Sequence, residues 1–179
     1  MKNFRGLLVF LSSLLLAACS SMPVGNLHVP EPAKAVQLDR YTGLWYEIAR
    51  YQNSFEKGCE AVTAQYDALE DGRIAIINTC HKNSVSGHIS TATGKAKVVK
   101  GSQNAKLKVS FFGPFYVGDY WILDHADDYS WSIVGEPSGR YLWILTRNAH
   151  PNDTLVDELY TRAREMGYEI KILRMVVQQ

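Results

Sequence analysis

Hydrophobic and polar residues alternate along most of the chain after residue 44, and turn-forming residues interrupt the alternation at short intervals. A period of two is typical of strands with one buried face. We expect strands at 45–52, 59–68, 72–81, 90–99, 104–111, 117–125, 129–135 and 141–147. The links between them are short and contain turn signals such as Lys57-Gly58 and Gly113-Pro114. This pattern predicts an all-β antiparallel meander that closes as a barrel or a sandwich.

A helical period follows the last of these strands. Apolar residues recur on one stripe, which consists of Leu155, Val156, Leu159, Tyr160, Ala163 and Met166. Asn152 or Asp153 can cap the start of this helix, and Gly167 can cap its end. The stripe predicts a helix packed on the outside of the sheet. We expect one short final strand at 168–173.

The N-terminus has the pattern of a secretion signal. Its apolar run, Leu7–Leu16, has 10 residues and is too short for a membrane span, which needs about 20. The run ends in Leu16-Ala17-Ala18-Cys19, which resembles the lipobox of bacterial lipoproteins. The resemblance implies a signal peptide over 1–18 and acyl chains such as palmitate on Cys19. An ordinary signal peptide with an incidental cysteine is the alternative.

The composition fits one globular domain behind that signal. The chain has 179 residues, 46% hydrophobic and 21% charged, with a formal net charge of +1. This size can bury a real core, and the charge gives no reason to expect a nucleic-acid partner. Residues 19–38 contain several prolines and little periodicity, so we expect a lipid-anchored tether there and the folded domain over 39–179.

Three short motifs resemble the signatures of the lipocalin family. Gly43-x-Trp45-Tyr46 resembles the first, and Gly118-Asp119-Tyr120 the second, with Gly118 where Thr is usual. Arg147 stands where the third signature has its Arg. The stretches WYEIARY, VSFFGPFY and YLWILTR resemble the bacterial outer-membrane lipoprotein lipocalins. The resemblance implies an eight-stranded antiparallel up-and-down barrel with one C-terminal helix outside and a short final strand.

The resemblance also implies a protein that binds small hydrophobic molecules and is not an enzyme. In lipocalins the Trp45 and Arg147 positions stack at the closed end of the barrel, so Gly43, Trp45 and Arg147 are expected to close it. The expected ligand-lining residues are Glu47, Ala49, Tyr51, Val62, Ala64, Tyr66, Ile76, Asn78, Val109, Phe111, Tyr141 and Trp143. Their mixture of small, aromatic and polar side chains fits a lined cavity, and a packed core is the alternative.

Glu47 is the most unusual member of this set. Its strand face also carries Trp45, so a period of two places the carboxyl group inside the barrel. Burial predicts a raised pKa and requires a partner, which can be water, a Tyr hydroxyl or a ligand headgroup.

For the bacterial group, the resemblance implies fatty acids or lysophospholipids as ligands and a role in storage or transport for cell-envelope maintenance. It implies a site on the outer membrane, lipid-anchored and facing the periplasm. Lys57, Lys82 and Lys100 could meet anionic headgroups at the rim, or serve only solubility. No cofactor or metal is expected.

The aromatic loop, Phe111–Tyr116, leaves several readings open. It could gate the cavity, touch the membrane, pack a homodimer or form a rigid turn over the core. The alternative function is an interaction module whose filled barrel docks a partner protein through this loop.

Cys59 and Cys80 lie at the ends of neighbouring expected strands. In an oxidising periplasm they are expected to form a disulfide. The alternation puts them on opposite faces, so the bond requires a bulge near 58–61 or a position of Cys59 before the strand. Two free thiols, or a zinc site of Cys59, Cys80 and His81, are the alternatives. The scattered histidines and the lack of a G-x-S-x-G motif disfavour catalysis.

Overall fold

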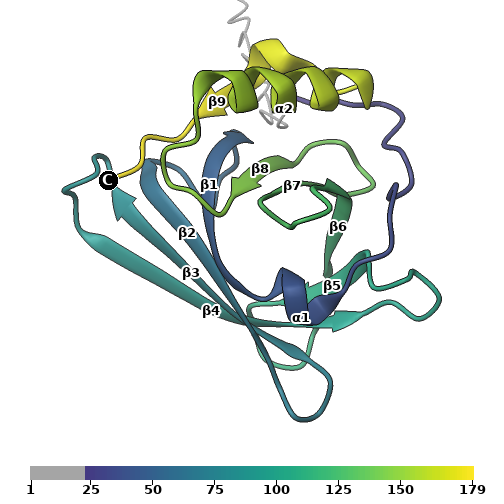
Figure 1. The fold of residues 1–179 in the computed structure, drawn as a ribbon. Coiled ribbons are helices and arrows are strands. Elements are labelled where there is room, and N and C mark those ends of the chain that lie inside the picture. Colours follow the sequence, from purple (N-terminus) through teal and green to yellow (C-terminus); the bar gives the residue numbers. More distant parts are fainter. Residues whose placement is uncertain (1–22) are drawn as a thin grey trace, which may run out of the picture.

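The structure, a computed structural model, describes residues 23–179 and contains a closed antiparallel barrel (Figure 1). Its strands are β1 (Gly43–Tyr51), β2 (Cys59–Ala68), β3 (Ile74–Lys82), β4 (Ile89–Val98), β5 (Lys106–Ser110), β6 (Gly118–His125), β7 (Trp131–Gly135) and β8 (Leu142–Thr146). Each strand pairs with its neighbours in sequence, and β1 closes the barrel by pairing with both β2 and β8. The expected barrel is confirmed. The expected signal peptide and Cys19 lie outside the described residues.

The alternating strand directions give the barrel two distinct ends. One end, here called the open end, carries the connections 52–58, 83–88, 111–117 and 136–141. The opposite, closed end carries the connections 69–73, 99–105 and 126–130 and the short helix α1 (Leu38–Tyr41). Leu38 and Tyr41 pack into the barrel core from this helix. One end is therefore plugged by the chain itself.

Helix α2 (Asp153–Glu165) lies outside the barrel, as the apolar stripe predicts (Figure 1). Asn152 caps it, with its side-chain oxygen accepting a 2.9 Å hydrogen bond from the Leu155 N–H. Leu159 and Ala163 are fully buried against Ile133 and Ile144 of the barrel wall. The helix therefore stabilises the outer face of β7 and β8.

The segment after α2 differs from the sequence prediction. The chain forms a 3₁₀ turn, η1 (Ile170–Ile172), and only then a strand, β9 (Leu173–Met175), which pairs with β1. The expected strand at 168–173 is therefore wrong in position. Tyr168 is buried in the cluster between α2 and the barrel, so this part of the chain serves packing rather than sheet pairing.

The residues before α1 do not form a free tether. Gly25 and Asn26 donate backbone hydrogen bonds of 2.9 and 3.2 Å to the Gly139 carbonyl at the open end. Further along, the Val36 N–H donates a 3.0 Å bond to the Gln103 carbonyl at the closed end. Residues 25–36 therefore follow the barrel wall from one end to the other. The expectation of a spacer over 19–38 is corrected for this part.

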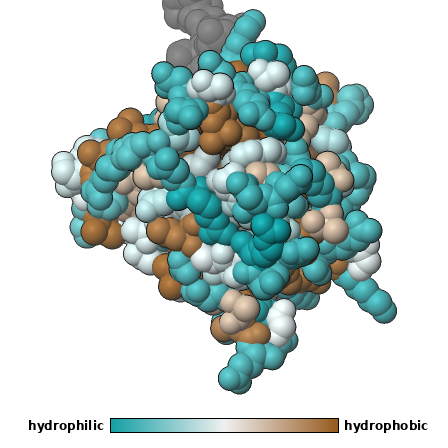
Figure 2. Space-filling view, viewed as in Figure 1, coloured by the Kyte–Doolittle hydropathy of each residue, from teal (hydrophilic) through white to brown (hydrophobic). Residues whose placement is uncertain are grey.

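Two main hydrophobic clusters hold the fold together, one inside the barrel and one between the barrel and α2. All of their members lie between Val29 and Leu173, which is the content an independently folding domain requires. The face drawn in Figure 2 is largely hydrophilic, with separate hydrophobic patches. This agrees with a sheet whose polar alternate residues point outward.

Candidate functional site

The closed end is built around Trp45 and Arg147. The Trp45 side chain is fully buried, and the Arg147 guanidinium carbon lies 3.7 Å from the centre of a Trp45 ring. Arg147 also donates hydrogen bonds of 2.6 and 2.8 Å to the carbonyls of Leu44 and Thr42. Gly43 has a φ of +96°, and a Cβ there would lie 3.3 Å from Arg147 Nη1. These contacts seal the barrel at this end, with Trp45 fully buried beneath Arg147.

A hydrogen-bonded group of tyrosines fills the barrel directly above this plug. The Tyr120 hydroxyl lies 2.8 Å from that of Tyr41 and 3.0 Å from that of Tyr66. Burial raises the pKa of Tyr41 to about 12 and also raises the pKa of Tyr66, so both phenols remain protonated. The cavity beside them has a volume of about 10 Å³, which is room for about one water molecule. The closed half of the barrel is therefore packed.

A bulge in β1 reverses the alternation above the plug. Glu47 pairs with Leu145, and Ala49 pairs with Ile144, so Ile48 is an extra residue. Arg50 then pairs with Trp143, whose side chain packs against the interior cluster. Directly paired residues share a face, so Arg50 points into the barrel.

The same bulge turns two expected lining residues outward. Ala49 and Tyr51 belong to the cluster beneath α2, and the Tyr51 hydroxyl donates a 3.0 Å bond to the Glu169 carbonyl. Their assignment to the ligand cavity is corrected. In their place the structure brings Arg50 inside, a residue that a strict period of two puts on the outer face.

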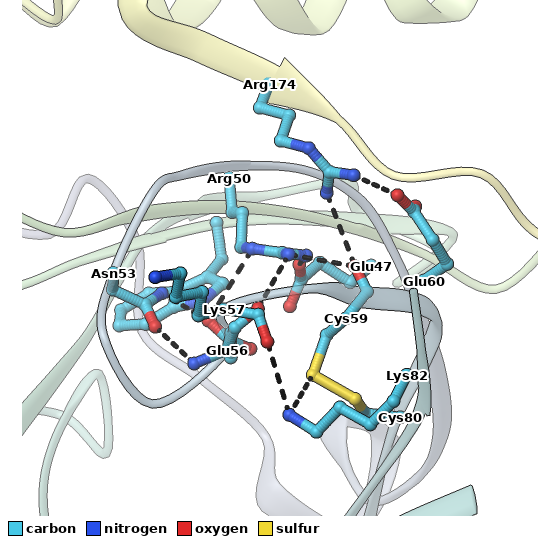
Figure 3. The surroundings of a disulfide bond; sticks show 11 residues. Glu47, Arg50, Asn53, Glu56, Lys57, Cys59, Glu60, Cys80, Lys82 and Arg174 are labelled. Carbon is cyan, nitrogen blue, oxygen red and sulfur yellow. Dashed lines mark hydrogen bonds and ion pairs between the residues drawn. A yellow bond between two sulfur atoms is a disulfide. The ribbon is translucent and has the colours of Figure 1, made fainter. Parts of the chain in front are cut away.

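Arg50 organises a buried polar network in the open half of the barrel (Figure 3). Its side chain has no exposed surface, and Nη1 donates a 2.6 Å hydrogen bond to Glu47 Oε1. Nη2 donates to the carbonyls of Glu56 and Cys59 at 3.1 and 2.9 Å. Glu56 accepts further bonds from Asn53 and, at 3.1 Å, from Trp143 Nε1. This network ties the connection between β1 and β2 to the barrel interior.

The network contains two carboxyl groups and one guanidinium. Burial, followed by the charge of Glu56, raises the pKa of Glu47 well above 4.5, and Arg50 opposes this shift. The expected partner of Glu47 was a water, a Tyr hydroxyl or a ligand. The structure supplies Arg50 instead, so the Glu47 carboxyl group is paired within the protein and does not require a ligand headgroup as its partner.

Aromatic side chains gather at the barrel opening beside this network, on the side of β1 and β8. Phe55 lies with its ring centre 5.7 Å from Tyr141 and 6.4 Å from Trp143, and Tyr141 stacks on Trp143 at 5.6 Å. We call these three residues the mouth cluster. Phe55 is 60% exposed and Tyr141 and Trp143 are half-buried, so apolar surface remains open to solvent here. Phe55 was not among the expected lining residues.

Phe111 directly follows β5, and its ring lies close to Gly94 of the neighbouring strand β4. A Cβ on Gly94 would come within 2.8 Å of Phe111 Cδ1, so the ring covers β4 where that strand has no side chain. Phe111 is 37% exposed. That Phe111 lines the ligand cavity stays a prediction.

The other expected lining residues divide between three places. Tyr66 and Ile76 are buried in the interior cluster, and Ala64 and Val109 pack against it. Asn78 pairs with Ala64, and its Oδ1 atom has no hydrogen-bond partner among the described residues. Val62 instead packs with Val176 and the two cysteines in a small separate cluster.

Cys59 and Cys80 form a disulfide in the structure, with Cα atoms 5.3 Å apart. The bulge that the sequence requires is present, because the pairing of β2 with β3 shifts between Glu60 and Thr63 and Ala61 has a φ of +44°. Lys82 Nζ lies 3.3 Å from Cys59 Sγ (Figure 3). The disulfide removes both thiols from the alternative zinc site.

The rim lysines are placed at different ends. Lys57 lies in the connection between β1 and β2, and Lys82 ends β3, so both stand at the open end. Lys100 lies in the connection between β4 and β5 at the closed end. It is therefore no rim residue, and that expectation is corrected.

The range 23–179 holds no group of three His, Cys, Asp or Glu side chains arranged to bind a metal ion. Within it, no helix has the length and apolar character needed to cross a membrane.

The lipocalin-like domain family matches residues 36–178. The chain belongs to the lipocalin family. This lipocalin is 37% identical over 176 residues to the outer membrane lipoprotein Blc of Vibrio cholerae serotype O1, covering 98% of this chain and 99% of that one. It is 36% identical over 165 residues to Blc of Escherichia coli strain K12, covering 89% and 88%.

Solved structures agree on the fold. The cockroach allergen Per a 4 superposes with a TM-score of 0.66 at 20% identity, covering 87% of this chain and 96% of that chain. Insecticyanin of the tobacco hornworm gives 0.64 at 18% identity, covering 83% and 84%. Lipocalins are binding proteins, so the expectation that this chain is not an enzyme is confirmed by its family.

Proposed function

We propose that this lipocalin is a lipoprotein anchored to the bacterial outer membrane through Cys19, on the side facing the periplasm. It binds fatty acids or lysophospholipids and stores or transports them during maintenance of the cell envelope. Leu16-Ala17-Ala18-Cys19 supports the anchor, and so do the relatives that are named outer membrane lipoproteins. Several acyl chains give stable anchoring, since each buried CH₂ contributes about 0.8 kcal/mol.

The mouth cluster is the observation that carries the proposed ligand class. Phe55, Tyr141 and Trp143 present aromatic surface at the only end of the barrel that α1 does not plug. An acyl chain laid against them leaves water, which stabilises the complex by about 25 cal/mol per Å² of apolar area. Because the closed half is packed, the chain occupies the open half.

The charges of the site favour a headgroup that stays at the rim. Glu47, Arg50 and Glu56 place two acidic groups and only one basic group in the open half, which disfavours an anionic group inside the barrel. Lys57 is exposed at the open end and Lys82 lies half-buried beside it. A carboxylate or phosphate next to these lysines remains hydrated while its acyl chain is buried.

Binding is tested on the domain that begins at Ser20. Palmitic acid and a palmitoyl lysophosphatidylethanolamine are titrated into the domain, and native mass spectrometry identifies any lipid that co-purifies. Trp143→Ala is expected to weaken binding about tenfold, which corresponds to about 1.4 kcal/mol. Trp121→Ala is the control, because Trp121 packs outside the barrel beside Lys106. Equal affinities for both variants and the unchanged protein contradict the proposed site.

The anchor is tested separately. The intact mass of the protein purified from membranes is expected to include acyl chains. The Cys19→Ser variant is expected to lack these acyl chains and to be lost from the outer-membrane fraction. Protection from protease in intact cells, followed by cleavage after the outer membrane is opened, supports the periplasmic side. A protein without acyl mass contradicts the proposed anchor.

One observation favours a second candidate function. The cavity in the closed half is only about 10 Å³, which suits a filled barrel that serves as an interaction module. That module would dock a partner protein through the aromatic loop. The titration decides between the two, since a domain that binds neither lipid supports the interaction module.

A further inference from the structure

The exposed hydrophobic residues of the described chain gather at one end of the barrel. Twelve large hydrophobic side chains are exposed among residues 23–179. Eight of them stand at the open end: Val24, Leu27, Phe55, Ile89, Phe111, Phe112, Phe115 and Val117. At the closed end only Leu44 belongs to this set. Exposed apolar residues gathered at one end of a domain in this way point to a contact with a partner or a membrane.

The connection between β5 and β6 contributes the most exposed members. Phe112 is 85% exposed, Phe115 70% and Val117 82%, so none of them stabilises the core. Tyr116 between them turns back along the outer face of the sheet toward the closed end. There Lys97 Nζ lies 4.6 Å from its ring, and Arg73, the last residue before β3, donates a 3.4 Å bond to its hydroxyl. The sheet thus holds the loop at Tyr116, while the apolar side chains on either side of it stay exposed.

The path of the N-terminal segment fixes where an anchored membrane lies. Gly25 and Asn26 are bonded to Gly139, so the described chain starts at the open end. Only three residues separate Cys19 from Pro23, and this length of chain spans at most about 14 Å when fully extended. A strand of the length of β1 spans about 30 Å. An anchor at Cys19 therefore holds the bilayer near the open end and out of reach of the closed end.

We propose that the open end docks on the bilayer surface, with Phe112, Phe115 and Val117 inserted among the lipid headgroups. The barrel opening then faces the membrane, and a lipid passes directly between the bilayer and the mouth cluster. Interfacial apolar groups of this kind insert about 5–10 Å. This inference rests on the anchor of the proposed function, and it assigns the aromatic loop to the bilayer rather than to a protein.

The test uses the full acylated protein, taken from membranes and reconstituted into vesicles of phosphatidylethanolamine and phosphatidylglycerol. A nitroxide is attached at Phe115→Cys or, as the matched control, at Leu44→Cys. Both positions carry an exposed hydrophobic residue, and they lie at opposite ends of the barrel. Docking predicts that the label at 115 collides more with oxygen than with a water-soluble nickel complex, and that the label at 44 shows the opposite preference. Similar water accessibility at both positions overturns the inference.

A second copy of the chain is the competing occupant, and the same labels detect it. Spin–spin broadening at 115 that persists when the protein is diluted in the vesicles assigns the loop to a dimer and overturns docking. Phe112→Ser/Phe115→Ser is expected to keep its affinity for lysophosphatidylethanolamine in free solution. Its transfer of that lipid to vesicles is expected to slow about tenfold. Unchanged transfer also overturns docking.

The two proposals fail in different measurements. Only protein whose mass includes the acyl chains enters the vesicle experiment, so loss of the anchor is recognised beforehand. The titration reports lipid binding without a membrane. A protein that is acylated and binds lipid, yet leaves residue 115 in water, contradicts docking alone.

Discussion

Arg50 Nη1 and Glu47 Oε1 lie 2.6 Å apart inside the barrel, on a strand where the two residues would ordinarily face opposite ways. The extra residue at Ile48 brings them to the same side. Both side chains are removed from water, and the guanidinium also bonds the carbonyls of Glu56 and Cys59. The pair therefore joins the barrel wall to the connection that carries Phe55.

Arg50→Met is expected to lower the free energy of unfolding by about 3–5 kcal/mol, because it leaves buried carboxylates without their cation. Urea unfolding of the domain measures this change. Arg174→Met is the matched control, since Arg174 pairs directly with Arg50 across β9 and β1 but is 31% exposed. Its ion pair with Glu60 is expected to contribute less than about 1 kcal/mol. Equal losses for the two variants would contradict a special role for Arg50.

Glu47 is expected to make stability depend on pH. In the folded protein, burial and the charge of Glu56 raise the pKa of Glu47 well above 4.5. In the unfolded chain, the Glu47 carboxyl group has a pKa of about 4.3. Between these values the folded state keeps a proton that the unfolded state has released. The free energy of unfolding therefore falls as the pH rises through this window.

Glu47→Gln isolates this effect because its side chain does not titrate. Urea unfolding of both proteins is measured at about pH 4.5, 6 and 7.5. The unchanged protein is expected to lose stability relative to the variant as the pH rises. A difference that stays constant over this range would refute the raised pKa.

Arg147→Ala is expected to open the closed end. The guanidinium stacks on Trp45 and donates bonds to the Leu44 and Thr42 carbonyls, so its removal exposes the plug and leaves these acceptors unpaired. The expected loss in the free energy of unfolding is about 3 kcal/mol. Arg147→Lys keeps the charge but not the planar contact. Compared with Arg147→Ala, it is expected to recover less than half of the lost free energy of unfolding.

The control for this change is Arg162→Ala. Arg162 also lies over an indole, with its guanidinium carbon 5.0 Å from Trp131, but its side chain is 40% exposed. Its removal is expected to change stability by less than about 1 kcal/mol. If the two alanine variants unfold at the same urea concentration, this result contradicts the role of Arg147 in closing the barrel.

Most of the architecture could be predicted from the sequence because it depends on periodicity and turn chemistry. The alternation gave the strands to within a few residues, and the helical stripe gave α2 and its Asn152 cap. The final strand was misplaced because Ile170–Leu173 has strand-like composition. Tyr168 instead packs under α2, and pairing with β1 begins only at Leu173.

The candidate site was predicted less well, for one physical reason. A bulge changes the direction of every later side chain on its strand, and nothing in Glu47-Ile48-Ala49-Arg50 marks the extra residue. Ala49 and Tyr51 were therefore placed inside and Arg50 outside. In β2 the bulge could be anticipated, because two cysteines on opposite faces cannot otherwise bond.

The disulfide is expected to stabilise the open end without being needed for the fold. Cys59 and Cys80 are 21 residues apart, and a bond closing a loop of this size contributes about 3 kcal/mol by restricting the unfolded chain. Cys59→Ser/Cys80→Ser is expected to lower the free energy of unfolding by about this amount in urea. Adding reductant should bring the unchanged protein to the same midpoint and leave the variant unaffected. A variant that still responds to reductant would show that the stabilisation has another origin, because no thiol pair would remain in the domain from Ser20 onward.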